Sequence, residues 1–462
     1  MIFRTTRSGF LRAVQRLDAG YICSPGTQAQ ERIVVAQARG LNVLTLGGSN
    51  GIADIWAPNR FTRAYASSSE PSVPYLRPYD VFEYLPQAAD YLSVERTKQL
   101  DRYRLEAGMI LQSCSGRNLG PAVMVDQYLK DFVLSHDMIR IDIRDPEMAF
   151  YVLGYLNTPT AQALLRRDKT GSVIDHISPS HVQTLVVPLL EAIQLSEVAA
   201  KMERAVSIRS QARCEIADCI IEYGASLPAV SRSFQLHEGW TQSVSTVGSR
   251  LDVAPYDPQV LDMRNSLLVN GGRRLGDLAQ ARIPGRYVRY YVSEEFGTPI
   301  LSGRQLLQVR PVNLRYISER SFRDSSKYEL RSDWLAMQGE GRAEERIGFP
   351  VIVTPNRDGW LANNHILRIV PRYEDQAGAL FLAMASAQAQ IQVKALATGS
   401  VVDAVNPRDF ENVVVPPLDA ELGTKVLDAW HQLASADAIE NEVVALIESG
   451  LSEIAGESQI AS

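Results

Sequence analysis

The sequence lacks long apolar runs, and this absence excludes the simplest kind of membrane protein. Its 462 residues contain no uninterrupted apolar stretch of about 18 residues or more, the length that a membrane-spanning helix needs. Near the start, Arg4, Arg7 and Arg12 interrupt short apolar pieces. That region has neither the continuous apolar core nor the small-residue cleavage site of a signal peptide. We therefore expect a cytoplasmic protein.

Cysteine and histidine are scarce, which argues against metal centres and disulfide frameworks. The four cysteines are Cys23, Cys114, Cys214 and Cys219, and no two of them form a CxxC pair. None of the six histidines forms a pair at metal-ligand spacing. We expect buried free thiols and no metal bound to this chain.

Lysine is also rare, although basic residues are not. Only seven of the 47 basic residues are lysine, so forty are arginine, while the net charge is −6. A negative net charge alone argues against a nucleic-acid partner. Arginine, however, is the residue suited to bidentate contacts with phosphates and bases, so the positions of the arginines matter more than their sum.

Signatures of common enzymes are missing as well. There is no phosphate-binding loop, no Asn-Pro-Pro-Tyr motif and no paired acidic residues with a lysine of the nuclease type. We therefore expect a chain without a catalytic site of its own.

What the sequence does contain is an internal duplication. Four segments of the first half recur in the second half in the same order, at offsets of 226 to 234 residues. In pairs, first copy then second, they are Arg16–Ala19 with Arg250–Val253, Pro58–Tyr65 with Pro284–Tyr291, Ser135–Ile141 with Asn363–Ile369, and Thr170–Asp175 with Thr398–Asp403. Slowly drifting offsets are typical of loop insertions in a duplicated domain.

Each copy has the pattern of a mixed α/β domain. Short β-type runs such as Ala122–Val125 and Pro350–Val353 are bounded by Gly, Pro and Asn. One helix per copy is expected, over residues 146–166 and 376–396, ending near a Thr-Gly-Ser turn.

A long helix of a different character follows each copy. Apolar residues at alternating three- and four-residue steps predict a coiled-coil seam, which Arg209 interrupts. The charged residues Glu203, Arg204, Glu440 and Glu442 are expected on the solvated faces. The seam residues expected to form partner-docking helices are Val198, Met202, Ala205, Ile216, Val426, Trp430, Leu433 and Val443.

These patterns predict four consecutive parts. They are a first domain over 1–192, a first spacer helix over 193–228, a second domain over 229–419, and a second spacer helix with a tail over 420–462. The fold class is mixed α/β (α+β), with two duplicated domains separated by long antiparallel helices.

This organisation resembles the DNA specificity subunits of type I restriction–modification systems. The resemblance rests on the duplication, the spacer helices and three motifs of the first copy: Arg-Leu-Asp-Ala-Gly-Tyr at 16–21, the segment Gly108–Arg117, and Thr-Gly-Ser followed by Val-Val-Pro. The second copy places Tyr256 one residue later and differs over Trp334–Arg342. The resemblance covers essentially the whole chain.

The resemblance implies a non-catalytic subunit of an antiviral DNA-methylation and restriction system. Each repeat would be a target-recognition domain for one half of a bipartite double-stranded DNA site. The spacer helices would dock two adenine methyltransferase subunits, which would carry S-adenosylmethionine, while a separate motor–nuclease subunit would cleave. No cofactor would bind to this chain.

The candidate DNA-binding residues are of two kinds. Some recur in both copies, and others differ between the copies, as residues that contact different bases should. They are Arg60, Arg63, Arg117, His136 and Ser172 in the first copy, and Arg286, Arg289, Arg342, Asn363, Asn364 and Ser400 in the second. The paired arginines alternate with aromatic residues at near strand spacing, and a guanidinium can bind phosphate or guanine O6 and N7. Arg117 and Arg342 each follow a glycine, which allows close approach of the backbone.

Each of these residues also has a structural alternative. The paired arginines would equally form a surface salt-bridge ladder, and Ser172 and Ser400 would equally cap a turn. His136, Asn363 and Asn364 differ between copies, as base-contacting residues should if the half-sites differ, or they face the core. The Arg-Leu-Asp segments are expected to form internal ion pairs.

Two functions of other classes stay open. One is a duplicated protein–protein scaffold without DNA, or a specificity-like subunit of a different phage-defence system. The other is a nuclease or methyltransferase without recognisable motifs. Retention on DNA and its salt dependence separate the scaffold from a DNA-binding protein.

Overall fold

The computed structural model describes residues 22–67, 69–116, 119–167, 175–229, 239–243, 247, 250–341, 347–399 and 403–457. It divides into two compact units: unit 1 is Met1–Ser210 with Ser435–Ser462, and unit 2 is Gln211–Ala434. This division differs from the four consecutive parts drawn from the sequence, because each unit includes part of both long helices.

Unit 1 is built around an antiparallel four-stranded sheet of order β2-β9-β5-β7 and a three-stranded sheet of order β4-β3-β8. The strands of these sheets are β2 (Ala53–Trp56), β3 (Ser72–Leu76), β4 (Asp90–Ser93), β5 (Ile110–Ser113), β7 (Val123–Met124), β8 (Val133–Leu134) and β9 (Met138–Ile143). Two short ladders complete the unit: β1 (Asn42–Thr45) with β11 (Val186–Leu189), and β6 (Ser115–Gly116) with β10 (Asp175–His176).

Unit 2 repeats this topology, with one further strand, β14, in its second sheet. Its sheets have the orders β13-β21-β17-β19 and β14-β16-β15-β20. The strands are β13 (Ala279–Arg282), β14 (Tyr291–Val292), β15 (Thr298–Leu301), β16 (Arg315–Ile317), β17 (Leu335–Gln338), β19 (Pro350–Ile352), β20 (Leu361–Ala362) and β21 (Ile366–Pro371). The short ladders are β12 (Arg273–Arg274) with β23 (Val414–Val415), and β18 (Glu340–Gly341) with β22 (Asp403–Ala404). The predicted fold class, two duplicated mixed α/β domains with long helices, is confirmed.

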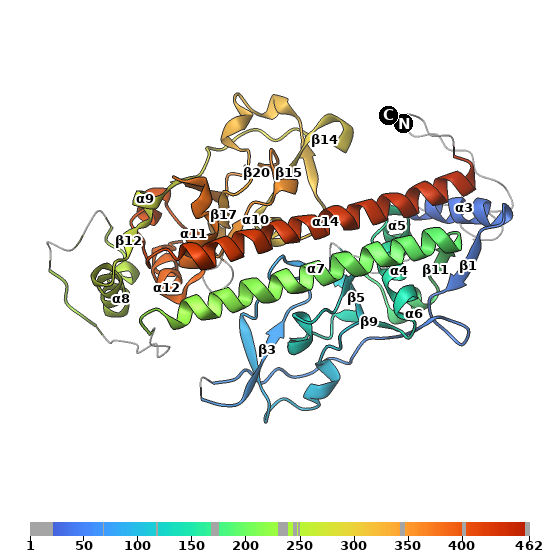
Figure 1. The fold of residues 1–462 in the computed structure, drawn as a ribbon, viewed down its shortest axis with the longest axis horizontal. Coiled ribbons are helices and arrows are strands. Elements are labelled where there is room, and N and C mark those ends of the chain that lie inside the picture. Colours follow the sequence, from blue (N-terminus) through green and yellow to red (C-terminus); the bar gives the residue numbers. More distant parts are fainter. Residues whose placement is uncertain are drawn as a thin grey trace. The chain divides into compact units, whose positions relative to one another are not determined.

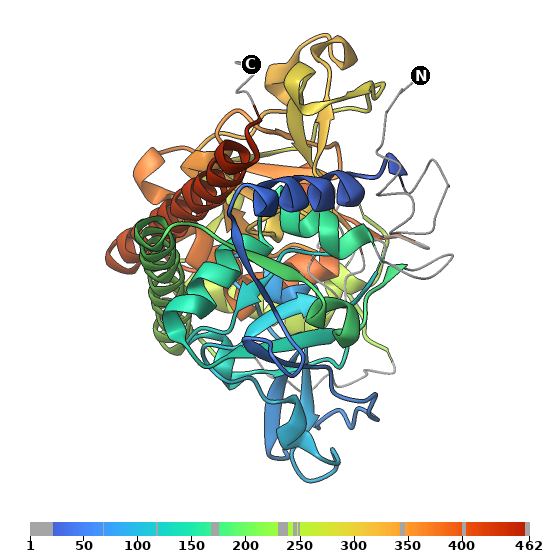
Figure 2. The same ribbon diagram turned by 90° about the vertical axis from the view of Figure 1, so that its right-hand side faces the viewer.

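Four helices also correspond between the units, α3 to α8, α4 to α11, α5 to α12 and α6 to α13, while α9 and α10 are additional in unit 2 among the described residues. In unit 1 they are α3 (Pro25–Ala38), α4 (Pro146–Leu156), α5 (Pro159–Arg167) and α6 (Pro179–Gln183). In unit 2 they are α8 (Pro258–Val269), α9 (Leu275–Leu278), α10 (Gly303–Leu307), α11 (Ala377–Ala385), α12 (Ala387–Leu396) and α13 (Pro407–Phe410). Figure 2 shows α3, in dark blue, lying along α5. The contact is close, because a Cβ added at Gly26 would lie 2.5 Å from the Ala163 carbonyl oxygen.

The prediction of one helix per copy was wrong, since each copy has two helices in that region. In unit 1 the break falls at Pro159, which has no N–H to donate to the preceding turn. The Thr158 hydroxyl accepts from the Ala161 N–H at 3.1 Å, as the N-cap of the second helix. In unit 2 Ser386 has an extended backbone (φ −61°, ψ 146°) and accepts from the Ala389 N–H.

The two long helices are α7 (Ala192–Ala225) and α14 (Ala420–Ala455). In unit 1 they run antiparallel: Lys201 pairs with Glu442 at 3.2 Å, while Arg209, further along α7, pairs with the earlier Asp437 at 3.0 Å. In unit 2 the Tyr223 hydroxyl donates to the Pro417 carbonyl, just before α14 begins, at 2.8 Å. Figure 1 shows β5, β9 and α4 beside the N-terminal half of α7.

The apolar seam of these helices is buried inside the chain, as its spacing predicted. All eight residues assigned to partner docking have at most 1% of their surface exposed. Val198, Met202 and Val443 belong to the main core cluster of unit 1. Their assignment as partner-contacting residues is therefore corrected, because side chains buried in the core cannot touch another protein.

Glu440 is a second correction on these helices. It was expected on a solvated face, but its side chain is only 5% exposed, because it forms an ion pair with the buried Arg209. Glu203, Arg204 and Glu442 are exposed, as expected. Among the helices in the described part of the chain, none is both long enough and apolar enough to cross a membrane.

Candidate nucleic-acid interface

The arginine-rich loop of unit 1 follows β2 and spans residues 58–65; we call it loop 1. Arg60 and Arg63 are exposed on it, while the Phe61 ring between them turns inward. Phe61 stacks on Tyr103 with ring centroids 3.9 Å apart. The Tyr103 hydroxyl donates to the Asn59 carbonyl at 2.9 Å. The aromatic pair thus holds the loop backbone, while the two arginines on either side of Phe61 stay exposed.

Arg63 and His136 lie together beside this loop. The Arg63 Nε donates to the Tyr75 hydroxyl at 2.8 Å, and its guanidinium lies 5.5 Å from the centre of that ring. The His136 ring meets Phe61 edge to face at 6.4 Å. The structure therefore brings three of the predicted residues, Arg60, Arg63 and His136, into one basic cluster.

The cluster lowers the pKa of His136. Burial is the largest cause, and the positive charges of Arg63 and Arg60 act in the same direction, while Asp137 opposes them. The unfolded chain therefore takes up this proton more readily than the folded chain does. By linkage, the contribution of His136 to stability is fully present above the ordinary histidine pKa of about 6.5 and is lost as the pH falls below it.

We predict that His136→Asn, which introduces the residue found at the equivalent position 364, reduces this acid sensitivity. The free energy of unfolding, measured by denaturant titration at pH 7.5 and 5.5, should fall less in the variant than in the parent chain. An equal fall in both proteins would contradict the assignment of the acid sensitivity to His136.

Unit 2 presents an equivalent loop after β13, spanning residues 284–291, which we call loop 2. Arg286 and Arg289 are exposed, and the Tyr287 ring turns inward against Phe322 and Tyr328 with centroids 4.7 and 4.8 Å away. Burial raises the pKa of the Tyr287 hydroxyl. The Tyr328 hydroxyl donates to the Gly285 carbonyl at 2.9 Å, which repeats the bond between Tyr103 and Asn59.

Loop 2 exposes more apolar surface than loop 1. Val288, Tyr290 and Tyr291 are 62%, 54% and 46% exposed, beside the two arginines. The Arg315 guanidinium lies 4.8 Å from the centre of the Tyr291 ring. Aromatic faces next to arginine are suited to sugars and base edges, whereas a surface salt-bridge ladder would have acidic partners.

The two asparagines of unit 2 have supporting roles. Asn363 accepts the His365 N–H at 2.9 Å with its side-chain oxygen, which shapes the turn between β20 and β21. Asn364 is 8% exposed and accepts from the Arg289 guanidinium at 3.4 Å. His365 forms an ion pair with Glu340. Asn364 therefore positions an arginine instead of presenting its own amide to solvent.

Arg117, Ser172, Arg342 and Ser400 lie outside the described residues. Their flanking segments are described, and they pair in both units: Gly116 stands opposite Asp175, and Gly341 opposite Asp403. Arg250, which opens the second Arg-Leu-Asp segment, bonds to Asp252 at 2.8 Å and to Asp409 at 3.0 Å. The internal ion pair predicted for that segment is confirmed, while Arg16–Asp18 lies outside the described residues.

Sequence reasoning missed the groups that support the two loops. They are Tyr103 and Tyr328, with one buried arginine in each unit, Arg140 and Arg368. The arginines recur inside the aligned segments Ser135–Ile141 and Asn363–Ile369. The signal that could have identified these two residues is an arginine that recurs at the same position among apolar strand residues in both copies.

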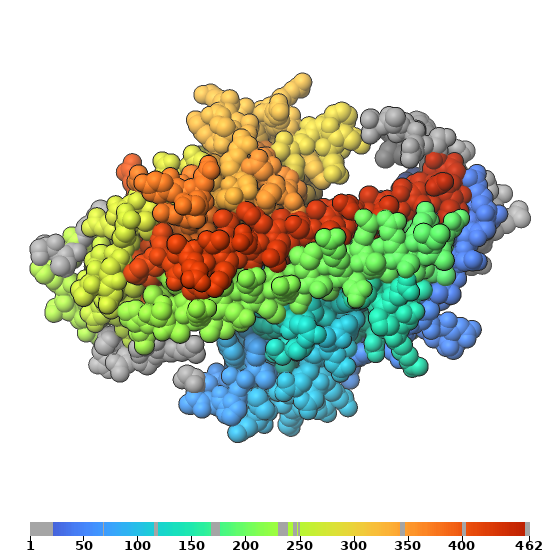
Figure 3. Space-filling view, in the orientation of Figure 1, coloured from blue at the N-terminus to red at the C-terminus, as the bar shows by residue number. Residues whose placement is uncertain are grey.

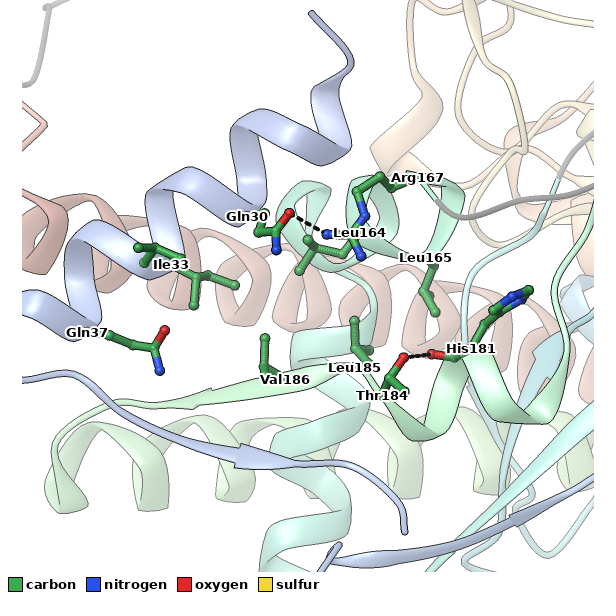
Figure 4. Close-up of a pocket in the computed structure, with 11 residues that line it drawn as sticks. Gln30, Ile33, Gln37, Leu164, Leu165, Arg167, His181, Thr184, Leu185 and Val186 are labelled. Carbon is green, nitrogen blue, oxygen red and sulfur yellow. Dashed lines mark hydrogen bonds between the residues drawn. The ribbon is translucent and has the colours of Figure 1, made fainter. Parts of the chain in front are cut away.

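A hollow of about 180 Å³ in unit 1 lies apart from these loops, among α3, α5, α6 and β11 (Figure 4). Two of its polar side chains are paired with groups of the hollow itself: Arg167 donates to Gln30 at 2.6 Å, and Thr184 donates to the His181 carbonyl at 2.9 Å. No candidate residue lines it. The described part of the chain also holds no cluster of His, Cys, Asp and Glu suited to a metal ion.

Comparison with known proteins gives matches among solved structures only, since no protein-family model and no curated protein matches this chain. The type I restriction-modification S subunit from M. genitalium is 12% identical, covers 90% of this chain and 96% of its own, and has a TM-score of 0.32. The HsdS subunit from Thermoanaerobacter tengcongensis is 13% identical, with 88% and 99% covered and a TM-score of 0.27. A structure describing complex assembly and conformational transition of the type I R-M system is 14% identical, with 90% and 97% covered and a TM-score of 0.27.

Proposed function

We propose that this chain is a DNA sequence-specificity subunit, in which each unit contacts one half of a bipartite double-stranded site. The observation that carries the proposal is the duplicated loop. In both units two exposed arginines stand on a backbone that an inward-facing aromatic ring and a tyrosine hydroxyl hold in place. Pre-positioned guanidinium groups beside aromatic surface match the chemistry of phosphates and guanine edges.

The differences between the loops support two different half-sites. Loop 1 is flanked by the titratable His136, whereas loop 2 is flanked by Asn364 and by the contact of His365 with the Glu340 carboxylate. Loop 2 also exposes more apolar surface. Two copies of one scaffold with different donors and acceptors would select different bases, since each base pair presents its own pattern in the major groove.

We also propose that adenine methyltransferase subunits, which would hold S-adenosylmethionine, dock on the outer sides of the long helices. A motor–nuclease subunit would complete a restriction complex. The outer side of α7, green in Figure 3, is uncovered on the face shown. It exposes Ile193 by 83% and Ile221 by 69%.

The experiment that tests DNA recognition is selection of duplexes from a random-sequence library, followed by binding to the enriched duplex. We expect Arg60→Ala with Arg63→Ala to weaken recognition of one half-site, and Arg286→Ala with Arg289→Ala to weaken the other. Each lost bidentate base contact costs about 1–3 kcal/mol. Each lost phosphate contact instead lowers the slope of log affinity against log salt by about 1.

Binding at two salt concentrations, to duplexes in which either half-site is scrambled, distinguishes these two effects. Arg39→Ala with Arg144→Ala is the matched control, because it removes two exposed arginines of unit 1 that lie outside the loop. If neither loop variant differs from this control, the loops do not bind DNA. If the parent chain enriches no duplex, that result would favour the alternative function, a protein–protein scaffold that does not bind DNA.

A further inference from the structure

Each unit buries one arginine beneath its loop. Arg368 on β21 is 0% exposed, and Arg140 at the equivalent position of β9 is 1% exposed. Neither forms an ion pair with a carboxylate within the part of the chain that the structure describes. Burial without a carboxylate lowers the pKa of both guanidinium groups to about 10.

Such a residue is costly for a protein core. A buried charge loses its hydration, and apolar residues of similar volume are often as stable or more stable at such positions. The same arginine nevertheless occupies the same strand position in both copies. Its hydrogen bonds therefore indicate what the unit gains from it.

Arg368 joins two segments that are separate in sequence. One side of its guanidinium donates to the carbonyl of Tyr328 at 2.7 Å. The other donates to the carbonyls of Asn363 at 3.3 Å and Ile366 at 2.7 Å, which begin and end the turn between β20 and β21. A planar guanidinium can bridge several carbonyls in this way, which a lysine ammonium cannot do with the same geometry.

Both segments support loop 2 directly. The Tyr328 hydroxyl holds the carbonyl of Gly285, the residue before Arg286. Asn364, inside the turn, accepts from Arg289. The two exposed arginines of loop 2 are thus connected to Arg368 through two intervening residues each: Tyr328 and Gly285 lead to Arg286, and Asn363 and Asn364 lead to Arg289.

Arg140 repeats the arrangement in unit 1 with longer bonds. Its guanidinium donates to the carbonyls of Tyr103 and Met138, both at 3.5 Å. The Tyr103 hydroxyl holds the carbonyl of Asn59, the residue before Arg60. The connection from buried arginine through tyrosine to loop is the same in the two copies.

We propose that Arg368 and Arg140 are positioning residues, each of which sets the conformation of the DNA-binding loop in its own unit without contacting DNA. The proposal has a structural part, that the buried arginines hold the loops in place, and this concerns the loops alone. Its DNA part, that they thereby affect DNA binding, rests on the proposed function. Under this proposal two buried side chains affect the affinity for each half-site, although only the exposed arginines would contact DNA.

The structural part is tested by hydrogen–deuterium exchange on the full chain. Arg368→Met removes the charge at similar volume, and Tyr328→Phe removes only the hydroxyl that holds Gly285. We expect both variants to speed amide exchange over residues 285–291, and to leave residues 58–65 unchanged. Arg357→Met is the matched control, since Arg357 is a buried arginine of the same unit that donates to the Leu306 carbonyl at 2.9 Å.

The DNA part uses the duplex enriched from the random library and its two scrambled-half versions. We expect Arg368→Met and Tyr328→Phe each to weaken binding through one half-site about tenfold or more, the loss of one base contact. The Arg368→Met, Tyr328→Phe double variant should bind about as weakly as Arg368→Met alone, because both act on the same loop. Arg140→Met should affect the other half-site.

The outcomes separate the inference from the proposed function. Unchanged exchange in loop 2 in both variants, or equal acceleration there in Arg357→Met, would overturn the positioning role. Faster loop exchange with unchanged DNA affinity would also overturn it. If the parent chain enriches no duplex, the proposed function fails, and the exchange result still decides whether the buried arginine holds the loop.

Discussion

Methyl transfer to DNA is expected to be absent when this chain is incubated alone with duplex DNA and labelled S-adenosylmethionine. It should appear when an adenine methyltransferase encoded beside this chain is added, at about a hundredfold above background or more, as for a genuine enzymatic rate. The physical reason is that, in the proposed function, the loops supply hydrogen-bond donors for DNA, and the partner holds the methyl donor.

Two comparisons make this result informative. The methyltransferase alone shows whether this chain is needed, and the complex with both loop arginine pairs replaced shows whether its DNA contacts are needed. Transfer by the rigorously purified chain alone would contradict the prediction. A methyltransferase equally active without this chain would remove the proposed role.

A large loss of stability is expected from Arg209→Ala. The Arg209 side chain is 11% exposed and contacts both Asp437, at 3.0 Å, and Glu440. The Tyr84 hydroxyl donates to the second oxygen of Asp437 at 2.8 Å. Although burial opposes the charge, the two carboxylates outweigh it and raise the pKa of Arg209. Removing the cation would take away the positive charge that contacts both buried carboxylates, at a cost of about 3–5 kcal/mol.

Denaturant-induced unfolding of the full chain measures this loss. Lys201→Ala is the matched control, since it breaks an ion pair between the same helices that is largely exposed, with an expected cost below about 1 kcal/mol. Replacing Arg209, Asp437 and Glu440 together by leucine should restore part of the stability, because the two buried carboxylates are removed together with their cation. Equal losses in Arg209→Ala and Lys201→Ala would show that the buried group is not stabilising.

The duplication explains why so much of the fold could be predicted. Segments that recur in one order must form the same strands in the same neighbourhood, and β9 and β21 indeed occupy equivalent sheet positions. The helix break before Pro159 was a missed local signal, since proline at the start of a helix is a common marker. Heptad spacing located the seam of the long helices but could not tell an internal core from a partner surface, because both require apolar residues.

The site was predictable only in its exposed part. Arg60, Arg63, Arg286 and Arg289 lie in one repeated pattern, whereas the groups that hold them come from distant segments. Tyr103 follows Asn59 by 44 residues, and Arg368 follows Tyr328 by 40. Such contacts depend on how strands are ordered in the sheet, which spacing along the chain does not reveal.

The division of the chain also has a consequence for how new specificities can arise. Unit 2 is one continuous stretch, Gln211–Ala434, inserted into unit 1, whose two parts close on each other through Arg209 and Asp437 next to both junctions. A single recombination cassette can therefore exchange the whole of unit 2 and leave the core of unit 1 intact. Unit 1 cannot be transferred as one fragment, because its core includes Val443, Ile447 and Leu451 from the far end of the sequence. Under the proposed function, grafting should therefore alter one half-site far more readily than the other.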